Sequence, residues 1–317
     1  MVGHSDRRTP AFTGVVILSL ILCGVMVSGC LDLERDDEDD RIRIVVSVLP
    51  LKEFAERIGG DNVKVTVMVG EGQDPHGYEP RPSQLKDVAR ADLFFKVGSG
   101  LEFENVWMET LIEQNGDMEI VDGSQGIELL ESGEGENGTR AGEDENDHDH
   151  EDHDPHIWTS PVNAIRMVET LRDALMNIDP ENAGEYGNNS LTYVKELEVM
   201  DAELRTGLGP FPGGKFLVYH PSFGYLAHEY NLSQIAIENE GKEPTPSGIQ
   251  AIIDQAKAEN ITTVFVSPQF DQANADVIAD EIDGVVVSID PLDAGYIANM
   301  RVIGEKLIEG FGRGGEE

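Results

Sequence analysis

The stretch IVVSVLPLKEFAERIGGDNVKVTVMV, residues 44–69, decides the fold. It begins and ends in β-branched runs, IVVSV at 44–48 and VKVTVMV at 63–69. Short apolar runs of this kind are typical of strands buried in a parallel sheet. Residues 51–58, between the two runs, are expected to form a short helix. A strand–helix–strand unit of this length predicts two parallel strands joined by a right-handed crossover.

The same alternation continues through both halves of the chain. The further segments of the first half are helices at 82–91 and 104–114 and strands at 93–97 and 118–121. Those of the second half are strands at 215–219, 232–237, 262–267 and 285–289 and helices at 223–230, 247–259, 273–282 and 296–311. The predicted fold class is therefore α/β, with two lobes that each contain a mostly parallel β-sheet flanked by helices.

One long helix is expected to join the lobes. A helical pattern after Pro161 ends near residue 178, and Pro180 is well placed to begin a second helix that reaches about residue 207. Its apolar positions are sparse, which is typical of a strut that contacts each lobe over part of its length. The predicted divisions are a signal peptide at 1–29, an acidic tether at 30–42, an N-terminal lobe at 43–178, the rigid linking helix at 179–207 and a C-terminal lobe at 208–317.

The N-terminal segment resembles a lipoprotein signal. Arg7 and Arg8 precede an uncharged apolar run at 11–27, which ends in the small residues and cysteine of VSGC at 27–30. We expect Cys30 to carry lipid, and the alternative is an ordinary signal anchor. The sequence leaves open whether export follows the Sec or the twin-arginine route. Because Cys23 lies inside the apolar run, Cys30 is the only cysteine of the mature chain. A disulfide framework and a thiolate metal site are therefore excluded.

The charge balance limits the partners. The 317 residues include 23 basic and 61 acidic side chains, which gives a formal net charge of −38. Nucleic acid and anionic membrane surfaces are poor partners for such a chain. The acidity is either a solvated surface suited to high salt or a means of attracting cations.

Residues 131–154 interrupt the alternation. They consist almost entirely of Gly, Asp, Glu, Asn and His, which predicts an exposed loop. The sequence EDENDHDHEDHDPHIW at 143–158 places four histidines close together, namely His148, His150, His153 and His156. His156 lies where the loop rejoins the first lobe.

Three other polar residues follow expected strands. His76 comes after the second strand, His220 directly after the first strand of the second lobe, and Asp290 directly after its last strand. Ligands bind at the carboxyl ends of strands in open α/β sheets. Together with His156, these residues form a plausible tetrahedral shell for zinc, with two ligands from each lobe. Individually, each could instead be a capping or turn residue.

Several longer motifs resemble those of the zinc/manganese-type substrate-binding lipoproteins of metal ABC transporters. They are DPHGYEPRPSQLKDVARADLFFKVGSGLE, DPHIWTSP, YHPSFGYLAHEYNL, GKEPTPSGI and IDPL, and they extend over nearly the whole mature chain. The resemblance implies two α/β lobes joined by a rigid helix, with metal held between them by His76, His156, His220 and Asp290.

The resemblance also implies the setting. The protein is expected at the outer face of the cytoplasmic membrane as a lipid-anchored monomer that serves an ABC permease and, through it, a cytoplasmic ATPase. Two features depart from the usual pattern. Asp293 replaces a glycine after DPL, and only some members have an acidic histidine-containing loop. We expect His148, His150 and His153 to bind metal weakly, as auxiliary sites, unless they are merely solvated. His228 is expected to be a surface or packing residue.

The expected cargo is Zn²⁺, because the four proposed ligands supply three nitrogens and one carboxylate. Mn²⁺ prefers more oxygen and is the alternative. A zinc-dependent hydrolase is a rival class, but the sequence contains no HExxH motif and no nucleophile elbow. A surface adhesin is a third class, and it is compatible with metal binding.

Overall fold

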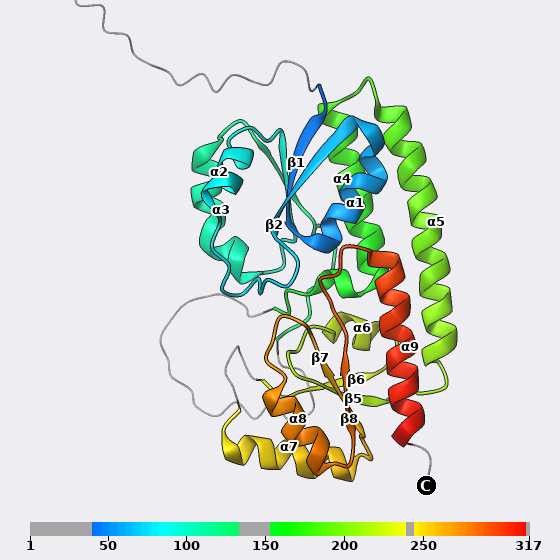
Figure 1. The fold of residues 1–317 in the computed structure, drawn as a ribbon. Helices are drawn as coiled ribbons and strands as arrows, with labels where there is room; N and C mark the ends of the chain where they lie inside the picture. Colours follow the sequence, from blue (N-terminus) through cyan, green and yellow to red (C-terminus); the bar gives the residue numbers. More distant parts are fainter. Residues whose placement is uncertain (1–39, 133–152, 239–243, 315–317) are drawn as a thin grey trace, which may run out of the picture. The chain divides into compact units, whose positions relative to one another are not determined.

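The computed structural model describes residues 40–132, 153–238 and 244–314 (Figure 1). By packing, the chain divides into Met1–Arg35 and Asp36–Glu317, and every described element belongs to the second unit. The predicted signal peptide, Cys30 and most of the tether and acidic loop lie outside the described residues. Among the helices of the described residues, none is long and apolar enough to cross a membrane.

The first sheet contains four parallel strands in the order β2-β1-β3-β4. The strands are β1 (Ile42–Val48), β2 (Val63–Val69), β3 (Leu93–Lys96) and β4 (Glu119–Asp122). The helices that accompany it are α1 (Leu49–Gly59), α2 (Pro82–Val88), α3 (Glu102–Gln114) and α4 (Pro161–Ile178), with short 3-10 turns at Gly60–Asn62 and Ile157–Thr159.

The second sheet repeats this plan with the order β6-β5-β7-β8, again all parallel. Its strands are β5 (Lys215–Val218), β6 (Ser233–Ala236), β7 (Thr263–Val266) and β8 (Val285–Ser288). Its helices are α6 (Gly224–Glu229), α7 (Pro246–Ala258), α8 (Ala273–Glu281) and α9 (Tyr296–Gly314). The predicted fold class is confirmed. The strand order reverses beside the first strand of each sheet, where α/β folds bind ligands.

The linking helix is α5 (Ala183–Leu208), which packs against α1 and α4 and also against α9 (Figure 1). Its start differs from the prediction that Pro180 begins it. Residues 179–182 instead form a turn, in which the Asn182 amide group donates to the Asp179 carboxylate at 2.8 Å and Tyr186 Oη donates to the same carboxylate at 2.6 Å. The carboxylate therefore holds the chain in a turn just before the helix.

The buried stripe of α5 explains why its apolar pattern is sparse in the sequence. The buried positions recur every three or four residues and are Tyr186, Ser190, Tyr193, Leu197, Met200, Leu204 and Leu208. Two of the aliphatic residues, Leu191 and Val199, are 57% and 53% exposed. Tyrosines therefore supply part of the packing face that aliphatic residues alone do not reveal.

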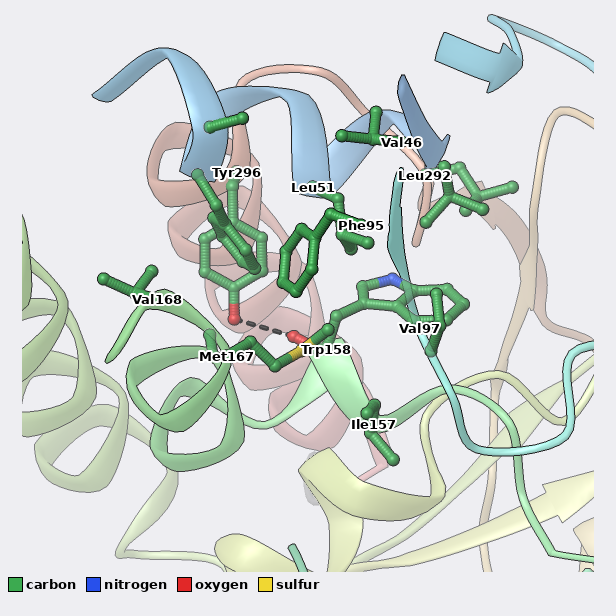
Figure 2. Close-up of a cluster of buried hydrophobic side chains, with 14 of the residues drawn as sticks. Val46, Leu51, Phe95, Val97, Ile157, Trp158, Met167, Val168, Leu292 and Tyr296 are labelled. Carbon is green, nitrogen blue, oxygen red and sulfur yellow. Dashed lines mark hydrogen bonds between the residues drawn. The ribbon is translucent and has the colours of Figure 1, made fainter. Parts of the chain in front are cut away.

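The larger of two hydrophobic clusters among the described residues runs from the first sheet into the second half of the chain, and Figure 2 shows part of it. Trp158 and Tyr296 lie in its centre, and the Tyr296 hydroxyl donates to the Trp158 carbonyl at 2.7 Å. The Trp158 indole N–H donates to the Pro291 carbonyl at 2.8 Å. A smaller cluster covers the other face of the second sheet, beneath α7 and α8. The segment that contains His156 is thus fixed against the segment that contains Asp290.

Candidate metal centre

Two Asp-Pro-His turns present histidines at the centre. The Asp74 carboxylate accepts the backbone N–H of His76 at 2.9 Å, and Asp154 accepts that of His156 at 2.9 Å. Each proline fixes its own φ angle, and each aspartate closes the turn. The two histidines are therefore presented by the same local device, although 80 residues of sequence separate them.

His220 comes from the second sheet, directly beyond β5. Its ring stacks on Phe270, with centroids 4.7 Å apart and the planes at 21°. His220 is 7% exposed and His156 is 4% exposed, whereas the side chain of His76 retains 27% exposure. Two imidazoles are thus enclosed and rigidly packed, and the third lies at the mouth of the site.

The three imidazoles meet at their Nε2 atoms. The Nε2 atom of His220 lies 3.1 Å from that of His76 and 3.4 Å from that of His156. One ligand atom from each histidine lies within 4.8 Å of the other two. Three nitrogen donors gathered in this way form the greater part of a tetrahedral site.

Carboxylates on the far side of the rings explain why Nε2 faces inward. Asp154 lies 2.8 Å from His156 Nδ1, and Glu238 lies 2.9 Å from His220 Nδ1. A carboxylate accepts only, so each of these Nδ1 atoms carries the proton and each Nε2 presents its lone pair. Glu102 lies farther from His76 Nδ1, at 3.8 Å. Lone pairs that face one another are stabilised by a cation placed between them.

Burial favours the neutral imidazoles that a metal requires. Desolvation lowers the pKa of His76, and the neighbouring His220 lowers it further. Desolvation also lowers the pKa of His220, against the hydrogen bond that its ring donates to Glu238, which raises the pKa. Because only neutral imidazole binds metal, the two shifts keep the rings of His76 and His220 available to a metal at lower pH than a free histidine.

A cavity of about 10 Å³ adjoins the three rings, which is room for one water-sized particle. The lining includes Ser222, Gln269 and Phe270 from the second half of the chain. The three nitrogen donors and the small enclosed volume fit a single divalent ion.

Asp290 lies close to this cavity but is not part of the group formed by the three histidines. Its Oδ1 atom accepts the Gln269 amide at 2.9 Å and the Leu292 backbone N–H at 2.9 Å. The second hydrogen bond closes an Asp-Pro-Leu turn with the same geometry as the two Asp-Pro-His turns. Its assignment as a metal ligand stays a prediction.

Of the other candidate residues that the structure describes, none belongs to the group formed by the three histidines. His153 forms an isolated bridge with Glu131, whereas His148, His150 and Cys30 lie outside the described residues. His228 is exposed on α6. Asp293 is also exposed, and its carboxylate accepts the Gly295 N–H at 2.7 Å.

Sequence reasoning missed three polar residues beside the centre, namely Asp154, Glu238 and Gln269. Glu238 follows β6 and Gln269 follows β7, so the strand-end argument that selected His220 also applies to them. In the second sheet each strand delivers a polar side chain to the same edge.

Comparison with known proteins identifies the family. A family model described as ZnuA, "Zinc-uptake complex component A periplasmic", matches residues 44–310. The zinc-binding lipoprotein AdcA of Streptococcus pneumoniae is 28% identical over 290 residues, which cover 88% of this chain but 55% of AdcA. The manganese-binding lipoprotein MntA of Halalkalibacterium halodurans is 28% identical over 256 residues, covering 80% of this chain and 78% of MntA.

Solved structures agree with the family match. A crystal structure of ZnuA superposes with a TM-score of 0.78 and 38% identity, over 86% of this chain and 100% of that chain. The present chain spans little more than half of AdcA but the full length of that ZnuA chain. Because the family model matches most of the sequence, this chain belongs to the ZnuA family of zinc-uptake components.

Proposed function

We propose that this protein is the extracytoplasmic metal-binding component of an ABC importer. It captures Zn²⁺ between its two sheets and delivers the ion to a membrane permease, which is driven by a cytoplasmic ATPase. The observation that carries the proposal is the grouping of three imidazoles, in which His220 Nε2 lies 3.1 Å from His76 Nε2 and 3.4 Å from His156 Nε2. Membership of the ZnuA family supports the same role.

The proposed ligands are His76, His156 and His220, with the carboxylate of Asp290 as the fourth. This set gives three nitrogens and one oxygen, which suits Zn²⁺ better than the oxygen-preferring Mn²⁺. One relative, MntA, is named for manganese, so Mn²⁺ is the competing cargo. Four protein ligands leave no open position for a reactive water, and the proposed role is therefore binding without catalysis.

The proposed location is the outer face of the cytoplasmic membrane, where the protein is a monomer anchored by lipid on Cys30. The relative AdcA is named a lipoprotein, which supports this anchoring. Cys30→Ala is expected to release soluble protein from membranes. Retention of the uncleaved variant in membranes would instead identify a signal anchor. The proposed role of His148, His150 and His153 is weak, auxiliary metal binding.

The decisive experiment measures zinc binding by the purified protein and two variants. Isothermal titration is expected to show one tight site that His220→Ala largely abolishes, because the variant loses one of three nitrogen donors. His228→Ala is the matched control, since its ring is exposed on α6. Normal zinc binding by His220→Ala would show that the three histidines do not form the zinc site. Zinc uptake in cells that lack the protein then tests whether the bound ion is transported.

A further inference from the structure

Gln269 lies on the turn after β7 and lines the cavity beside the three histidines. Its Nε2 atom donates to Asp290 Oδ1 at 2.9 Å, and the Leu292 N–H donates to the same oxygen at 2.9 Å. Among the described residues, Oδ1 is therefore the acceptor of both hydrogen bonds to the Asp290 carboxylate. The other oxygen, Oδ2, is the one left to bind a metal.

The carbonyl oxygen of the Gln269 amide, Oε1, is buried and accepts no hydrogen bond from the described residues. The amide cannot be reversed to relieve this, because Oε1 would then face the carboxylate oxygen of Asp290, and both atoms only accept. A buried carbonyl oxygen without a partner costs folding free energy, so its presence points to a role for the Nε2 donor.

We propose that Gln269 is a positioning residue that orients the carboxylate of Asp290 toward the bound metal. The inference rests on the proposed function, in which Asp290 is the fourth ligand. Carboxylates that bind metals are generally held by a hydrogen bond to another group of the protein, which fixes the oxygen that faces the ion. Gln269 supplies that hydrogen bond from the turn after β7, and β7 pairs with β8, the strand that Asp290 follows.

The first test compares zinc affinity in two glutamine variants, by titration against a competing chelator. Gln269→Met keeps the length of the side chain and removes the donor, and we expect about tenfold weaker binding. Gln250→Met is the matched control, because Gln250 donates to Asp254 Oδ1 at the same 2.9 Å on the exposed face of α7. Gln269→Glu places a second negative charge against Asp290 and is expected to weaken binding further. Unchanged affinity in Gln269→Met overturns the inference.

A double-mutant cycle shows whether Gln269 acts through Asp290. Asp290→Ala is expected to weaken zinc binding, and adding Gln269→Met is expected to have no further effect. Circular dichroism of each variant confirms that it is folded. Additive losses would mean that Gln269 acts by another route, which overturns the inference. If Asp290→Ala binds normally, the proposed ligand set fails as well; if only Gln269→Met binds normally, the ligand set stands.

The spectrum of bound Co²⁺ provides a readout that a purely structural role would not move. Cobalt takes similar ligands to zinc, and its visible absorption reports their arrangement. Gln269→Met is expected to change this spectrum in the same direction as Asp290→Ala, whereas Gln250→Met should leave it unchanged. A spectrum of Gln269→Met that matches the unaltered protein overturns the inference.

Discussion

The carboxylate partners of the histidines determine which nitrogen faces the ion. Glu238 is 6% exposed and lies 2.9 Å from His220 Nδ1, while Asp154 plays the same part for His156. A ring whose Nδ1–H is held in this way is fixed in both tautomer and orientation. The histidines therefore need little rearrangement to bind a metal.

Glu238→Gln is expected to weaken zinc binding by about tenfold, because the uncharged amide supports the His220 tautomer less strongly. Isothermal titration measures the affinity, and nitrogen NMR of the metal-free protein reports the tautomer. Glu102→Gln serves as the control, since Glu102 is 59% exposed and lies 3.8 Å from His76 Nδ1. Equal losses of zinc affinity in the two variants would contradict the role of Glu238 in holding the His220 tautomer.

Among the elements, α5 and α9 approach each other closely where one of them lacks a side chain. A Cβ atom on Gly304 of α9 would collide with Leu204 of α5, and one on Gly207 of α5 would lie 2.6 Å from Ile308. The glycines therefore let the linking helix pack directly against the last helix of the chain. This contact fixes α5 to the second half of the protein.

Gly304→Ala is expected to lower the free energy of unfolding by about 1 kcal/mol, because overpacking against the buried Leu204 side chain outweighs the gain in helix propensity from alanine. Urea denaturation measures the change. Gly312→Ala, also in α9, is the control: its added Cβ meets nothing within 4 Å, and alanine favours helix. Destabilisation of both variants to the same extent would show that the close helix contact is not the cause.

Deletion of residues 132–152 is expected to leave the tight zinc site intact. The deleted segment contains His148 and His150 but none of the four proposed ligands. The remaining ends can be joined, since Glu131 and His153 already form a bridge. In isothermal titration, the deletion variant should therefore show the tight site and lack only weaker ones. Disappearance of the tight site would mean that a ligand lies in the loop.

Across the whole described chain, the centre joins segments that are distant in sequence. His76 and His156 belong to the half that contains the first sheet, and His220 follows β5 of the second sheet. The Trp158 hydrogen bond to Pro291 already ties these halves together beside the site. A bound ion adds a further link, so metal affinity is expected to appear as resistance to unfolding.

Zinc is expected to raise the melting temperature, with a stabilisation of about 2.7 kcal/mol at a concentration 100 times the dissociation constant. The folded-state pKa values of His76 and His220 are lowered, so the unfolded chain binds more protons as pH falls below about 6.5. The stabilisation from these neutral histidines is therefore present above that pH and is lost as pH falls through the folded-state pKa values.

The zinc-dependent rise in melting temperature should also become smaller as pH falls, because protons compete with the metal for imidazole. Calorimetric scans with and without zinc, repeated from pH 7.5 to about pH 5, measure it. The rise should persist somewhat below pH 6.5 and then decline. A zinc effect that grows as pH falls would contradict a histidine site.

The sequence by itself determined the elements and most of the candidate centre. Runs such as IVVSV and VKVTVMV strongly favour β-strand, and the structure has strands at both. His76, His156 and His220 were selected because they follow strands or re-enter from the loop, and the three meet. These inferences depend on local pattern and on the rule that parallel strands end at one edge, which needs no coordinates.

Tertiary structure decided the contacts between segments. Glu238 reaches His220 across 18 residues, and Gln269 reaches Asp290 across 21. Tyrosines complete the buried face of α5, and the turn after Asp179 moves its start beyond Pro180. The two polar contacts depend on side chains that approach only after the strands have paired, and the tyrosines are buried only when α5 packs. The Asp179 turn is a local contact, which the apolar pattern does not reveal. Local propensity determines which element forms, but packing determines which polar groups meet and which nitrogen carries the proton.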